Sequence, residues 1–335
     1  MSTPALSVLL PVWDAEATLQ TSLRSIARQS EADFECLLVD DGSRDRSCEI
    51  ARDWQARDRR FHVIERPHEG IVAALNAGLE RCRGEFVARV DADDCLHRHR
   101  FRLQREALDA DPGLDAVGCH VRLFPRSNLA AGMRAYESWL LAIRGAGDVA
   151  RDVFVECPLA HPTWLVHRSL FAELPYRDRG WPEDYDWLLR AHRRGKRLGV
   201  VPRRLVSWRN GSERLSRRDP RYGIERFVAC KAHHLARGFL ADSDHYVLWG
   251  YGETGRNLHR ALAAEGLRAS HIVELHPGRL GQTIHGAAVI EPAALAGLAD
   301  SPLVVSVAGP GPRRQIRDRL AELGRLDGRD FVCAA

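Results

Sequence analysis

Residues 70–94 read GIVAALNAGLERCRGEFVARVDADD, and this stretch decides the fold. Its first half, Gly70–Arg81, places apolar residues at helical spacing, which predicts an amphipathic helix. Its second half contains the short apolar run Glu85–Val90, which predicts a strand that ends in the acidic sequence DADD (91–94). A helix that leads into a buried strand is typical of a βαβ unit and therefore of a parallel sheet.

The same alternation extends towards the N-terminus. Further strands are predicted at Ala5–Val12, Phe34–Val39 and Phe61–Ile64, and helices at Ala15–Gln29 and Asp45–Arg57. This order predicts an α/β fold with a parallel sheet covered by helices on both faces. Right-handed crossovers place the carboxyl ends of all these strands at one edge, which is where such sheets bind ligands. Acidic residues follow the second and fourth strands, so we expect them to meet at that edge.

Beyond about residue 114 the pattern loosens and then restarts. Strands are predicted at Leu114–His120, Trp164–His167, Leu198–Val201 and Leu205–Arg209, and helices at Asp184–Arg194 and Arg221–Arg237. The polar stretch Ala241–Asp244 is the expected boundary between a first domain, 1–240, and a second, 241–335. The second domain repeats the pattern with strands at His245–Trp249, His271–Leu275 and Pro302–Ala308 and helices at Arg256–Glu265 and Arg313–Gly324. It is expected to be a small Rossmann-like α/β domain.

Composition narrows the class of protein. A chain of 335 residues with 45% apolar and 28% charged residues is globular and large enough for two domains, which excludes a disordered or fibrous protein. The net charge of +4 is too small to indicate a nucleic-acid partner. The eight cysteines form no C-x-x-C pair, which argues against a zinc knuckle or a disulfide framework and favours a reducing compartment. No apolar run reaches the length of a membrane span, so we expect a cytoplasmic protein, and peripheral contact with the inner face of a membrane stays open.

The acids at the two strand ends are the first candidates for chemistry. Asp91 and Asp93 could both face one ligand and bind a hard divalent cation such as Mn²⁺ or Mg²⁺. The alternative is a solvated acidic turn, but the position at a strand end favours the cation. After the second strand, Asp40 could accept hydrogen bonds from a nucleobase or a ribose. Asp41 or Ser43 could instead cap the next helix, and the two roles are compatible.

A second acidic pair, Glu183 and Asp184, stands at the start of a predicted helix. Acids at a helix start complement the helix dipole, and taken alone this pair favours a capping role. The functional alternative makes one of them a general base. The arginines that follow, at 203, 204, 209, 214, 217, 218 and 221, could meet phosphate or form a solvated loop.

The predicted second domain carries a glycine motif of its own. Gly250-x-Gly252-x-x-Gly255 follows a strand and opens a helix, and Glu274 stands about 20 residues further on, as a dinucleotide-binding fingerprint requires. NAD(P) is therefore a candidate ligand of this domain. The alternative is a turn that needs glycine only for close packing and binds nothing.

Several of these stretches together resemble the family 2 glycosyltransferases. The resemblance is carried by LSVLLPVWDAEATLQTSLRSIARQS (6–30), FECLLVDDGSRD (34–45) and residues 70–94, and it covers residues 5–125 strongly. HPTWLVHRS (161–169) and WPEDYDWLLRAHRRG (181–195) extend it with less specificity. The combined order is highly specific, although no single piece is.

The resemblance implies a GT-A fold and the transfer of a sugar from a nucleoside-diphosphate donor with inversion, usually with Mn²⁺ or Mg²⁺. The acceptor would be a glycan, a lipid-linked molecule or a small molecule, as in the synthesis of polysaccharides, glycolipids or other cell-surface glycans. By position, the resemblance assigns a role to each candidate residue: Pro11 and Val12 border the nucleobase pocket, Asp40 contacts the base, Arg89 binds the donor, Asp93 lies nearest the metal, Asp91 lies towards ribose or metal, and Asp184 is the catalytic base with Glu183 in support.

Two features depart from the family pattern. The Q-x-x-R-W motif of its processive synthases is missing after the Glu183-Asp184 pair, which favours the addition of a single sugar. The domain at 241–335 is not required by the family fold. The residues alone also leave three alternatives open. The first is a nucleotidyltransferase, which would usually carry a Gly- and Arg-rich loop after the first strand. The others are an oxidoreductase centred on Gly250–Gly255 and a sugar-nucleotide or dinucleotide-binding module without transfer activity. The donor, the linkage and the oligomeric state are not determined by the sequence.

Overall fold

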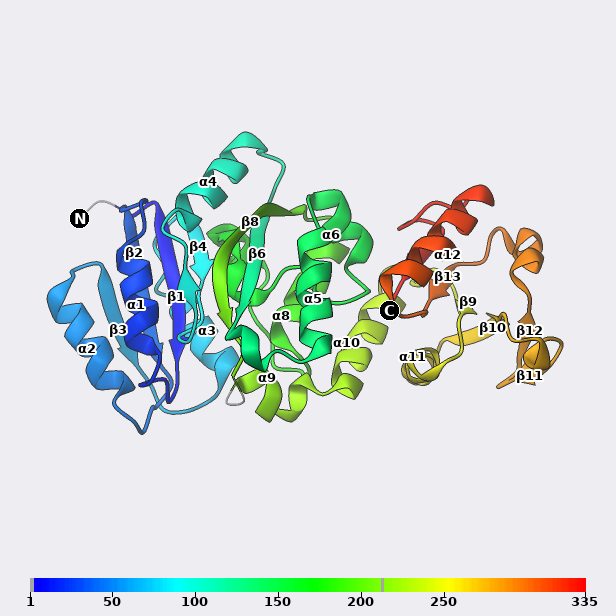
Figure 1. Cartoon of the computed structure of the whole chain (residues 1–335), viewed down its shortest axis with the longest axis horizontal. Coiled ribbons are helices and arrows are strands. Elements are labelled where there is room, and N and C mark those ends of the chain that lie inside the picture. The colour runs from blue at the N-terminus through cyan, green and yellow to red at the C-terminus, as the bar shows by residue number, and fades with distance from the viewer. Residues whose placement is uncertain (1–2, 212–213) are drawn as a thin grey trace. The chain divides into compact units, whose positions relative to one another are not determined.

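A computed structural model describes residues 3–211 and 214–335 (Figure 1). It contains an eight-stranded sheet of order β3-β2-β1-β4-β7-β6-β8-β5 and a six-stranded sheet of order β11-β12-β10-β9-β13-β14. The chain forms two compact units. The first unit contains Met1–Val149, Leu159–Arg179 and Arg194–Arg214, and the second contains Ala150–Pro158, Gly180–Arg193 and Leu215–Ala335.

The first unit contains the eight-stranded sheet. Its strands are β1 (Leu6–Val12), β2 (Phe34–Asp40), β3 (Phe61–Glu65), β4 (Phe86–Arg89), β5 (Cys95–Leu96), β6 (Ala116–Phe124), β7 (Leu165–His167) and β8 (Leu198–Arg209). Its helices are α1 (Leu19–Ala27), α2 (Ser47–Arg57), α3 (Ile71–Leu79), α4 (Arg100–Ala110), α5 (Ala131–Ala142) and α7 (Arg168–Glu173), and α6 (Ala146–Asp152) runs across the boundary between the units. Short 3₁₀ turns occupy Arg126–Asn128 and His161–Thr163.

The first four strands confirm the predicted parallel sheet. β1 lies between β2 and β4 and runs parallel to both, with Val12 opposite Asp40 and Leu9 opposite Arg89. The ends of β2 and β4 therefore flank the end of β1 at one edge of the sheet. This register brings the two acidic stretches of the sequence to the same edge.

Helices cover both faces of this half of the sheet. Val8 and Leu10 of β1 belong to a core that also contains Leu23 of α1. On the other face, a β-carbon placed on Gly78 of α3 would lie 2.2 Å from the Cδ1 atom of Leu9. Glycine at this position therefore allows α3 to lie directly on the sheet.

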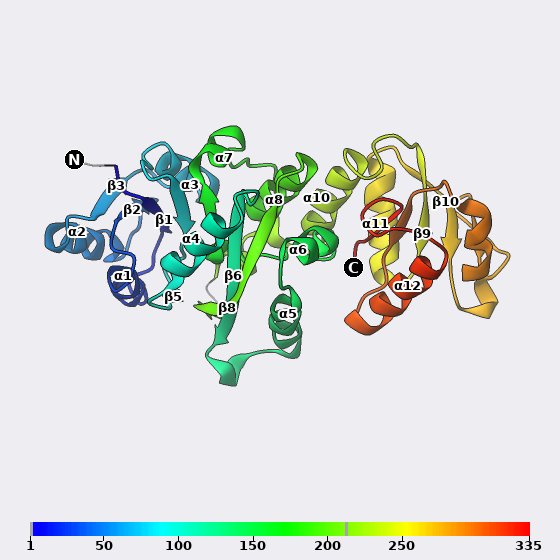
Figure 2. The same ribbon diagram turned by 90° about the horizontal axis from the view of Figure 1, so that it is seen from above.

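The other half of the sheet is mixed rather than parallel. β7 runs antiparallel to both β4 and β6, and β5 runs antiparallel to β8. An antiparallel strand needs no crossover helix, so the alternation of helices and strands that predicted the first half is missing here. The two strands expected at Leu198–Val201 and Leu205–Arg209 form one strand, β8, whose register against β6 shifts near His120. The sequence also gave no indication of α5, which lies alongside β6 (Figure 2).

The second unit contains the six-stranded sheet and three helices that precede it. Its strands are β9 (His245–Trp249), β10 (Arg268–Val273), β11 (Thr283–Ile284), β12 (Ala287–Ile290), β13 (Leu303–Val305) and β14 (Phe331–Cys333). Its helices are α8 (Glu183–Arg193), α9 (Leu215–Arg218), α10 (Ile224–Ala236), α11 (Glu253–Ala264) and α12 (Pro310–Glu322), with 3₁₀ turns at Pro220–Tyr222, Pro277–Arg279 and Pro292–Leu298.

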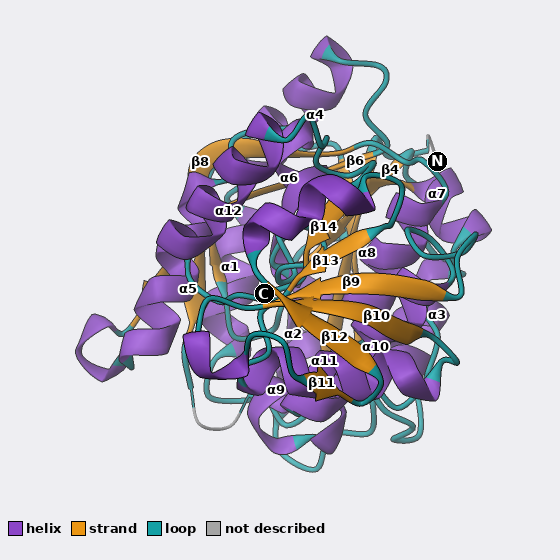
Figure 3. Ribbon diagram, turned by 90° about the vertical axis from the view of Figure 1, so that its right-hand side faces the viewer, coloured by secondary structure: helices purple, strands orange, loops and turns teal. Residues whose placement is uncertain are grey.

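Figure 3 shows the strands of this second sheet fanning out from one end. β12, β10, β9, β13 and β14 are parallel, and the short β11 pairs antiparallel with β12 at the edge. The core includes Trp249, Leu303, Leu320 and Phe331. The boundary predicted at residue 240 falls between α10 and β9, but the compact unit also includes α8 and α10, because α10 packs against both α8 and α11.

Within the part of the chain that is described, no helix combines the length and the apolar character needed to cross a bilayer.

Candidate active site

Three carboxylates gather in the turn after β4, in the first unit. Asp91, Asp93 and Asp94 each offer an oxygen, and these oxygens lie within 4.8 Å of one another. Asp94 is completely buried, and its Oδ1 atom accepts a hydrogen bond from the backbone N–H of Arg209 at 2.8 Å. Its Oδ2 atom is also buried and has no hydrogen-bond partner among the described residues. A buried carboxylate oxygen without a donor is an unfavourable arrangement unless a cation or another ligand completes it.

The protonation of these acids reflects their crowding. Burial, and then the charge of Asp91, raises the pKa of Asp93 to about 6, although Arg214 opposes this shift. Burial, and then the charges of Asp91 and Asp93, raises the pKa of Asp94 well above its ordinary value. A hard divalent cation prefers several carboxylate oxygens and would remove the repulsion among them. The acidic turn therefore fits a divalent cation.

Arginines from β8 and the segment after it surround the acidic turn. The Nε–H group of Arg209 donates to the backbone carbonyl of Asp93 at 2.8 Å, and the Nη2 atom of Arg214 lies 3.9 Å from the Oδ2 atom of Asp91. Arg89, which is buried, forms an ion pair with Asp91. Cations beside an acidic turn can contact the phosphates of a ligand held there. The sequence indicated a basic series that includes Arg209 and Arg214, but not that β8 would bring them to these acids.

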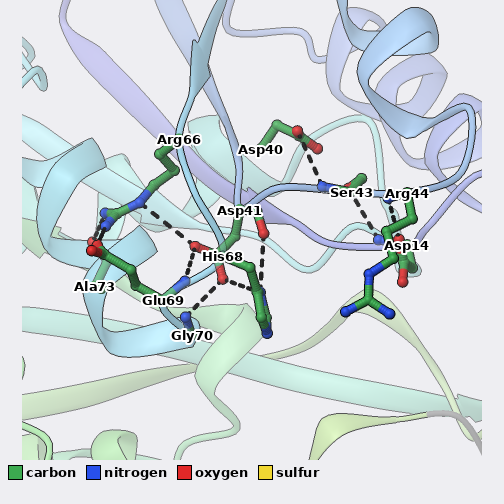
Figure 4. A network of polar contacts seen from close by, with 10 residues as sticks. All are labelled: Asp14, Asp40, Asp41, Ser43, Arg44, Arg66, His68, Glu69, Gly70 and Ala73. Atoms are coloured by element: carbon green, nitrogen blue, oxygen red, sulfur yellow. Dashed lines mark hydrogen bonds and ion pairs between the residues drawn. The ribbon is translucent and has the colours of Figure 1, made fainter.

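The end of β2 carries two aspartates with different surroundings, shown in Figure 4. The Oδ2 atom of Asp40 accepts a long hydrogen bond of 3.3 Å from the N–H of Ser43, and its Oδ1 atom is buried without a partner among the described residues. The carboxylate of Asp41 accepts hydrogen bonds from the N–H groups of Gly70, at 2.8 Å, and Glu69, at 3.2 Å. It also contacts His68 at 2.9 Å. Asp40 thus retains an oxygen for a ligand, whereas Asp41 is used by the fold.

Asp41 differs in one respect from the sequence prediction. The sequence predicted that Asp41 or Ser43 would cap the next helix, α2. Asp41 instead accepts the N–H groups of Glu69 and Gly70, which stand after β3 and directly before α3. The hydroxyl of Ser43 accepts the N–H of Asp14 at 3.1 Å. At the start of α2, the Oδ1 atom of Asp45 accepts the N–H of Ser47 instead, at 2.9 Å. This contact between the end of β2 and the residues before α3 forms because neighbouring strands end at the same edge of the sheet. The local sequence does not reveal such a contact.

An aromatic pair lies at the same edge. Trp13, which directly follows β1 and is 41% exposed, stacks on His68 with 4.6 Å between the ring centroids. Of the two residues expected to border a nucleobase, Pro11 is partly buried, while the side chain of Val12 lies in the core. The backbone carbonyl of Val12 accepts the N–H of Asp41 at 2.8 Å. Trp13 was not among the predicted site residues, and its only signal was a large aromatic residue at a strand end.

The acidic pair Glu183 and Asp184 lies at the start of α8, in the second unit. Glu183 is buried, and its Oε2 atom accepts a hydrogen bond of 2.7 Å from the hydroxyl of Tyr222. Burial, and then the charges of Glu183 and Asp184, raises the pKa of Tyr222 well above its ordinary value, so this hydroxyl remains a donor. Asp184 is only partly buried, and its Oδ1 atom accepts the N–H of Tyr185 at 2.7 Å. Of the two acids, Asp184 is the one accessible to a ligand.

A buried polar cluster fixes α8. The two carboxylate oxygens of Asp186 contact His234 of α10 at 3.0 Å and Arg190 at 2.7 Å. Burial alone would raise the pKa of Asp186, but these partners lower it to about 2. Cys230 lies close enough to complete a metal-binding set with Asp186 and His234. Because Arg190 already holds one carboxylate oxygen, the cluster is better explained as the anchor of α8 on α10.

The glycine motif lies after β9, also in the second unit. Gly250 and Gly252 lie between β9 and α11, Gly255 lies in the first turn of α11, and Glu274 follows β10. The Oε1 atom of Glu274 accepts the N–H of Tyr251 at 3.1 Å, so this acid lies beside the turn.

Comparison with known proteins gives the family. Residues 7–174, half of the chain, match the family model described as Glycosyl transferase family 2. The chain therefore belongs to glycosyl transferase family 2.

Similar proteins extend this finding. The uncharacterized glycosyltransferase EpsJ of Bacillus subtilis (strain 168) is 36% identical over 116 residues, which are 35% of this chain and 33% of EpsJ, so the match spans about a third of that relative. The chain also resembles the crystal structure of S. aureus TarS 1-349 in complex with UDP-GlcNAc, with a TM-score of 0.55 and 15% identity over 77% of this chain and 71% of that one. It resembles the mannosyltransferase PcManGT from Pyrobaculum calidifontis in complex with GDP-Man and Mn²⁺, with a TM-score of 0.52 and 17% identity over 97% of this chain and 81% of that one. At these identities the two structures show a shared fold.

Proposed function

We propose that this protein transfers a sugar from a nucleoside-diphosphate donor to an acceptor hydroxyl, with inversion at the anomeric carbon and with the help of a divalent cation. One observation carries the proposal. Three carboxylates with converging oxygens stand at the edge where the carboxyl ends of the parallel strands meet, and one of them has a buried oxygen that lacks a donor among the described residues. Family membership, and the Mn²⁺ and GDP-Man bound to PcManGT, support it.

The donor would bind along the edge of the first unit. Asp93 and Asp91 would hold Mn²⁺ or Mg²⁺, and Asp91 would also lie towards the ribose. When bound there, the cation supplies positive charge that offsets the charge developing on the departing diphosphate. Arg89 orients Asp91 through their ion pair, and Arg214 adds positive charge beside it.

The nucleobase would lie beside Asp40. The unpartnered Oδ1 atom of Asp40 can accept a hydrogen bond from a base N–H or a ribose hydroxyl. Pro11 and Val12 precede Trp13 on β1 and would border the base through their main chain. The exposed indole of Trp13, supported by His68, offers an apolar surface on which a base can stack.

Asp184 would act as the general base. It is a partly exposed carboxylate at a helix start and would accept the proton of the acceptor hydroxyl as that oxygen attacks the anomeric carbon. Glu183, held by Tyr222, would support its position from within the unit. We further propose that the acceptor is a glycan, a lipid-linked molecule or a small molecule of a cell-surface glycan pathway, and that a single sugar is added.

Product analysis tests the proposal. The full chain is incubated with UDP-GlcNAc or GDP-mannose, each with Mn²⁺ or with EDTA, and the released nucleotide is identified by chromatography. Release of UDP or GDP only when Mn²⁺ is present is expected for metal-dependent sugar transfer or donor hydrolysis. Release of a sugar 1-phosphate would show transfer of the nucleotidyl group instead, and equal release of nucleotide in EDTA would remove the cation from the proposal. The anomeric configuration of the product, measured by NMR, decides between inversion and retention.

A further inference from the structure

A cavity of about 690 Å³ lies in the second unit, at the carboxyl ends of β9, β10 and β13. The order of the sheet places β9 between β10 and β13. From β9 the chain passes through α11 to β10 on one side, and β13 lies on the other side, so the strand order reverses at this point. Parallel α/β sheets bind ligands in the crevice at such a reversal. The cavity is also of a size that holds a small-molecule ligand.

Three glycines line or support this cavity, and the space around their missing β-carbons differs. Gly250 has a φ of +95°, and a β-carbon there would lie 2.5 Å from Val307. A β-carbon on Gly255 would lie 2.1 Å from the backbone oxygen of Gly250, so α11 can approach the sheet only without a side chain. Gly252 has neither constraint: its φ is −70°, and nothing lies within 4 Å of its missing β-carbon. Close packing explains Gly250 and Gly255. Gly252 is the N-cap residue of α11, and the open space beside it borders the cavity.

The polar groups around Gly252 suit one chemical class. Gly252 precedes α11, and the N–H groups of the first turn of a helix favour a phosphate. Glu274, at the end of β10, offers its carboxylate to the hydroxyl groups of a ribose. The Oε1 atom of Glu274 also pairs with Arg279 at 2.9 Å, which fixes the carboxylate at the cavity. Leu275, next to it, is 74% exposed and gives the rim an apolar surface for a base.

We propose that this cavity binds the ribose diphosphate part of a ribonucleotide, with the diphosphate over Gly252 and the ribose diol on Glu274. This site is separate from the donor site proposed in the first unit and does not depend on it. The same chemistry is presented by a free nucleoside diphosphate and by NAD⁺, and the acid at the ribose disfavours a 2′-phosphate as in NADP⁺.

Calorimetric titration of the full chain tests the proposal. ADP and NAD⁺ are titrated separately in EDTA, which removes the cation that the proposed donor site needs. Gly252→Val fills the open space, and Glu274→Gln keeps an acceptor for the N–H of Tyr251 but loses the charge. Gly297→Val is the matched control, because Gly297 also has nothing within 4 Å of its missing β-carbon and lies outside the cavity lining.

One EDTA-insensitive site per chain is expected in the parent protein and in Gly297→Val. Gly252→Val should lose this site while it still unfolds in one cooperative melting transition. Glu274→Gln should bind ADP about tenfold more weakly, the loss expected for a hydrogen bond to a charged group. In the parent protein, 2′-deoxy-ADP should bind about tenfold more weakly than ADP, and in Glu274→Gln the two should bind equally. Tighter binding of NAD⁺ than ADP identifies a dinucleotide, and the reverse identifies a nucleoside diphosphate. Absence of binding in EDTA, or unchanged affinity in Gly252→Val and Glu274→Gln, would overturn the proposal.

Discussion

The carboxylate of Asp41 accepts a hydrogen bond of 2.8 Å from the backbone N–H of Gly70 and so joins the end of β2 to the start of α3. Its neighbour in sequence, Asp40, lies in the same buried edge but keeps one oxygen without a partner among the described residues. Two adjacent aspartates thus have separate roles. One accepts the N–H groups of the two residues directly before α3, and the other keeps an oxygen for a ligand.

Replacement of Asp41 should affect stability. Asp41→Ala leaves the N–H groups of Glu69 and Gly70 without their acceptor, and the free energy of unfolding should fall by about 1–3 kcal/mol. Urea unfolding followed by circular dichroism measures this change. A variant as stable as the parent protein would show that water replaces the carboxylate without cost.

Replacement of Asp40 should affect ligand binding instead. Asp40→Asn removes the charge that a base N–H or a ribose hydroxyl would meet, and nucleotide affinity in Mn²⁺ should fall roughly tenfold or more. The free energy of unfolding should stay within about 1 kcal/mol of the parent value, because Oδ1 has no protein partner to lose. Titration of UDP and GDP gives the affinity, and an unchanged affinity for both would remove Asp40 from the donor site.

Asp93 should be required for cation binding. In Asp93→Ala one of the three converging carboxylates is lost, and affinity for Mn²⁺ should fall about 10–100-fold. Binding is measured by electron paramagnetic resonance of free Mn²⁺. Asp109→Ala, an exposed aspartate on α4, is the matched control and should bind Mn²⁺ like the parent protein. Equal Mn²⁺ affinity in both variants would contradict the assignment.

Asp184 should affect the rate of transfer and not the affinity for the donor. Asp184→Asn removes the proposed base, so the transfer rate should fall about 10²–10⁴-fold while nucleotide affinity stays the same. Tyr222→Phe removes only the hydroxyl that donates to Glu183 and should reduce the rate by a smaller factor. Single-turnover kinetics with the donor found by product analysis provide both values. Transfer by Asp184→Asn at the parental rate would place the base elsewhere.

The lowered pKa of the buried Lys231 should affect how the free energy of unfolding changes with pH. Burial lowers the pKa of this amine from 10.5 to about 8, although Glu156 opposes the shift, and the amine donates to the carbonyls of Val155 and Ala334. Between pH 8 and 10.5 the unfolded chain therefore binds more protons than the folded one at this group, so its contribution to the free energy of unfolding rises with pH. A shift of this size corresponds to about 3 kcal/mol.

The matched variant for this prediction is Lys231→Met, which loses the titrating group. Its absolute stability should fall, because two carbonyls lose their donor. The comparison is therefore between the slopes of the free energy of unfolding against pH. Urea unfolding at pH 8, 9 and 10 should show that the parent protein gains stability relative to the variant as the pH rises. This difference cancels the titration of tyrosines and cysteines that do not interact with Lys231, which both proteins share. Parallel curves would contradict a lowered pKa.

The local pattern of the sequence was sufficient for the first four strands and the helices between them. Apolar runs such as Phe34–Val39 and amphipathic stretches such as Gly70–Arg81 carry their period within a few residues, so they identify an element wherever it packs. In the mixed half of the sheet the prediction was incomplete. The strand predicted at Trp164–His167 is present as β7, but the sequence did not indicate that it runs antiparallel to its neighbours. The sequence also missed β5, whose two residues carry too little periodicity to be recognised.

The sequence predicted only those parts of the candidate site that follow from local patterns and from the topology of a parallel sheet. The acids at 40, 91 and 93 could be found because strand ends of a parallel sheet share an edge, which is a rule of topology. The position of Arg209 and Arg214 beside those acids depends on the pairing of β8 with β5, whose residues stand 110–112 positions earlier, and with β6, whose residues stand 82–85 positions earlier. Such long-range pairing leaves no local mark.

The sequence by itself thus determined the family, the parallel half of the first sheet and the identity of the acids at its edge, because each depends on residue order within short segments. Only the tertiary structure decided which of two neighbouring aspartates keeps an oxygen without a protein partner and which of three glycines has open space beside it. Those answers depend on which atoms, distant in sequence, fill or leave open the space around each residue.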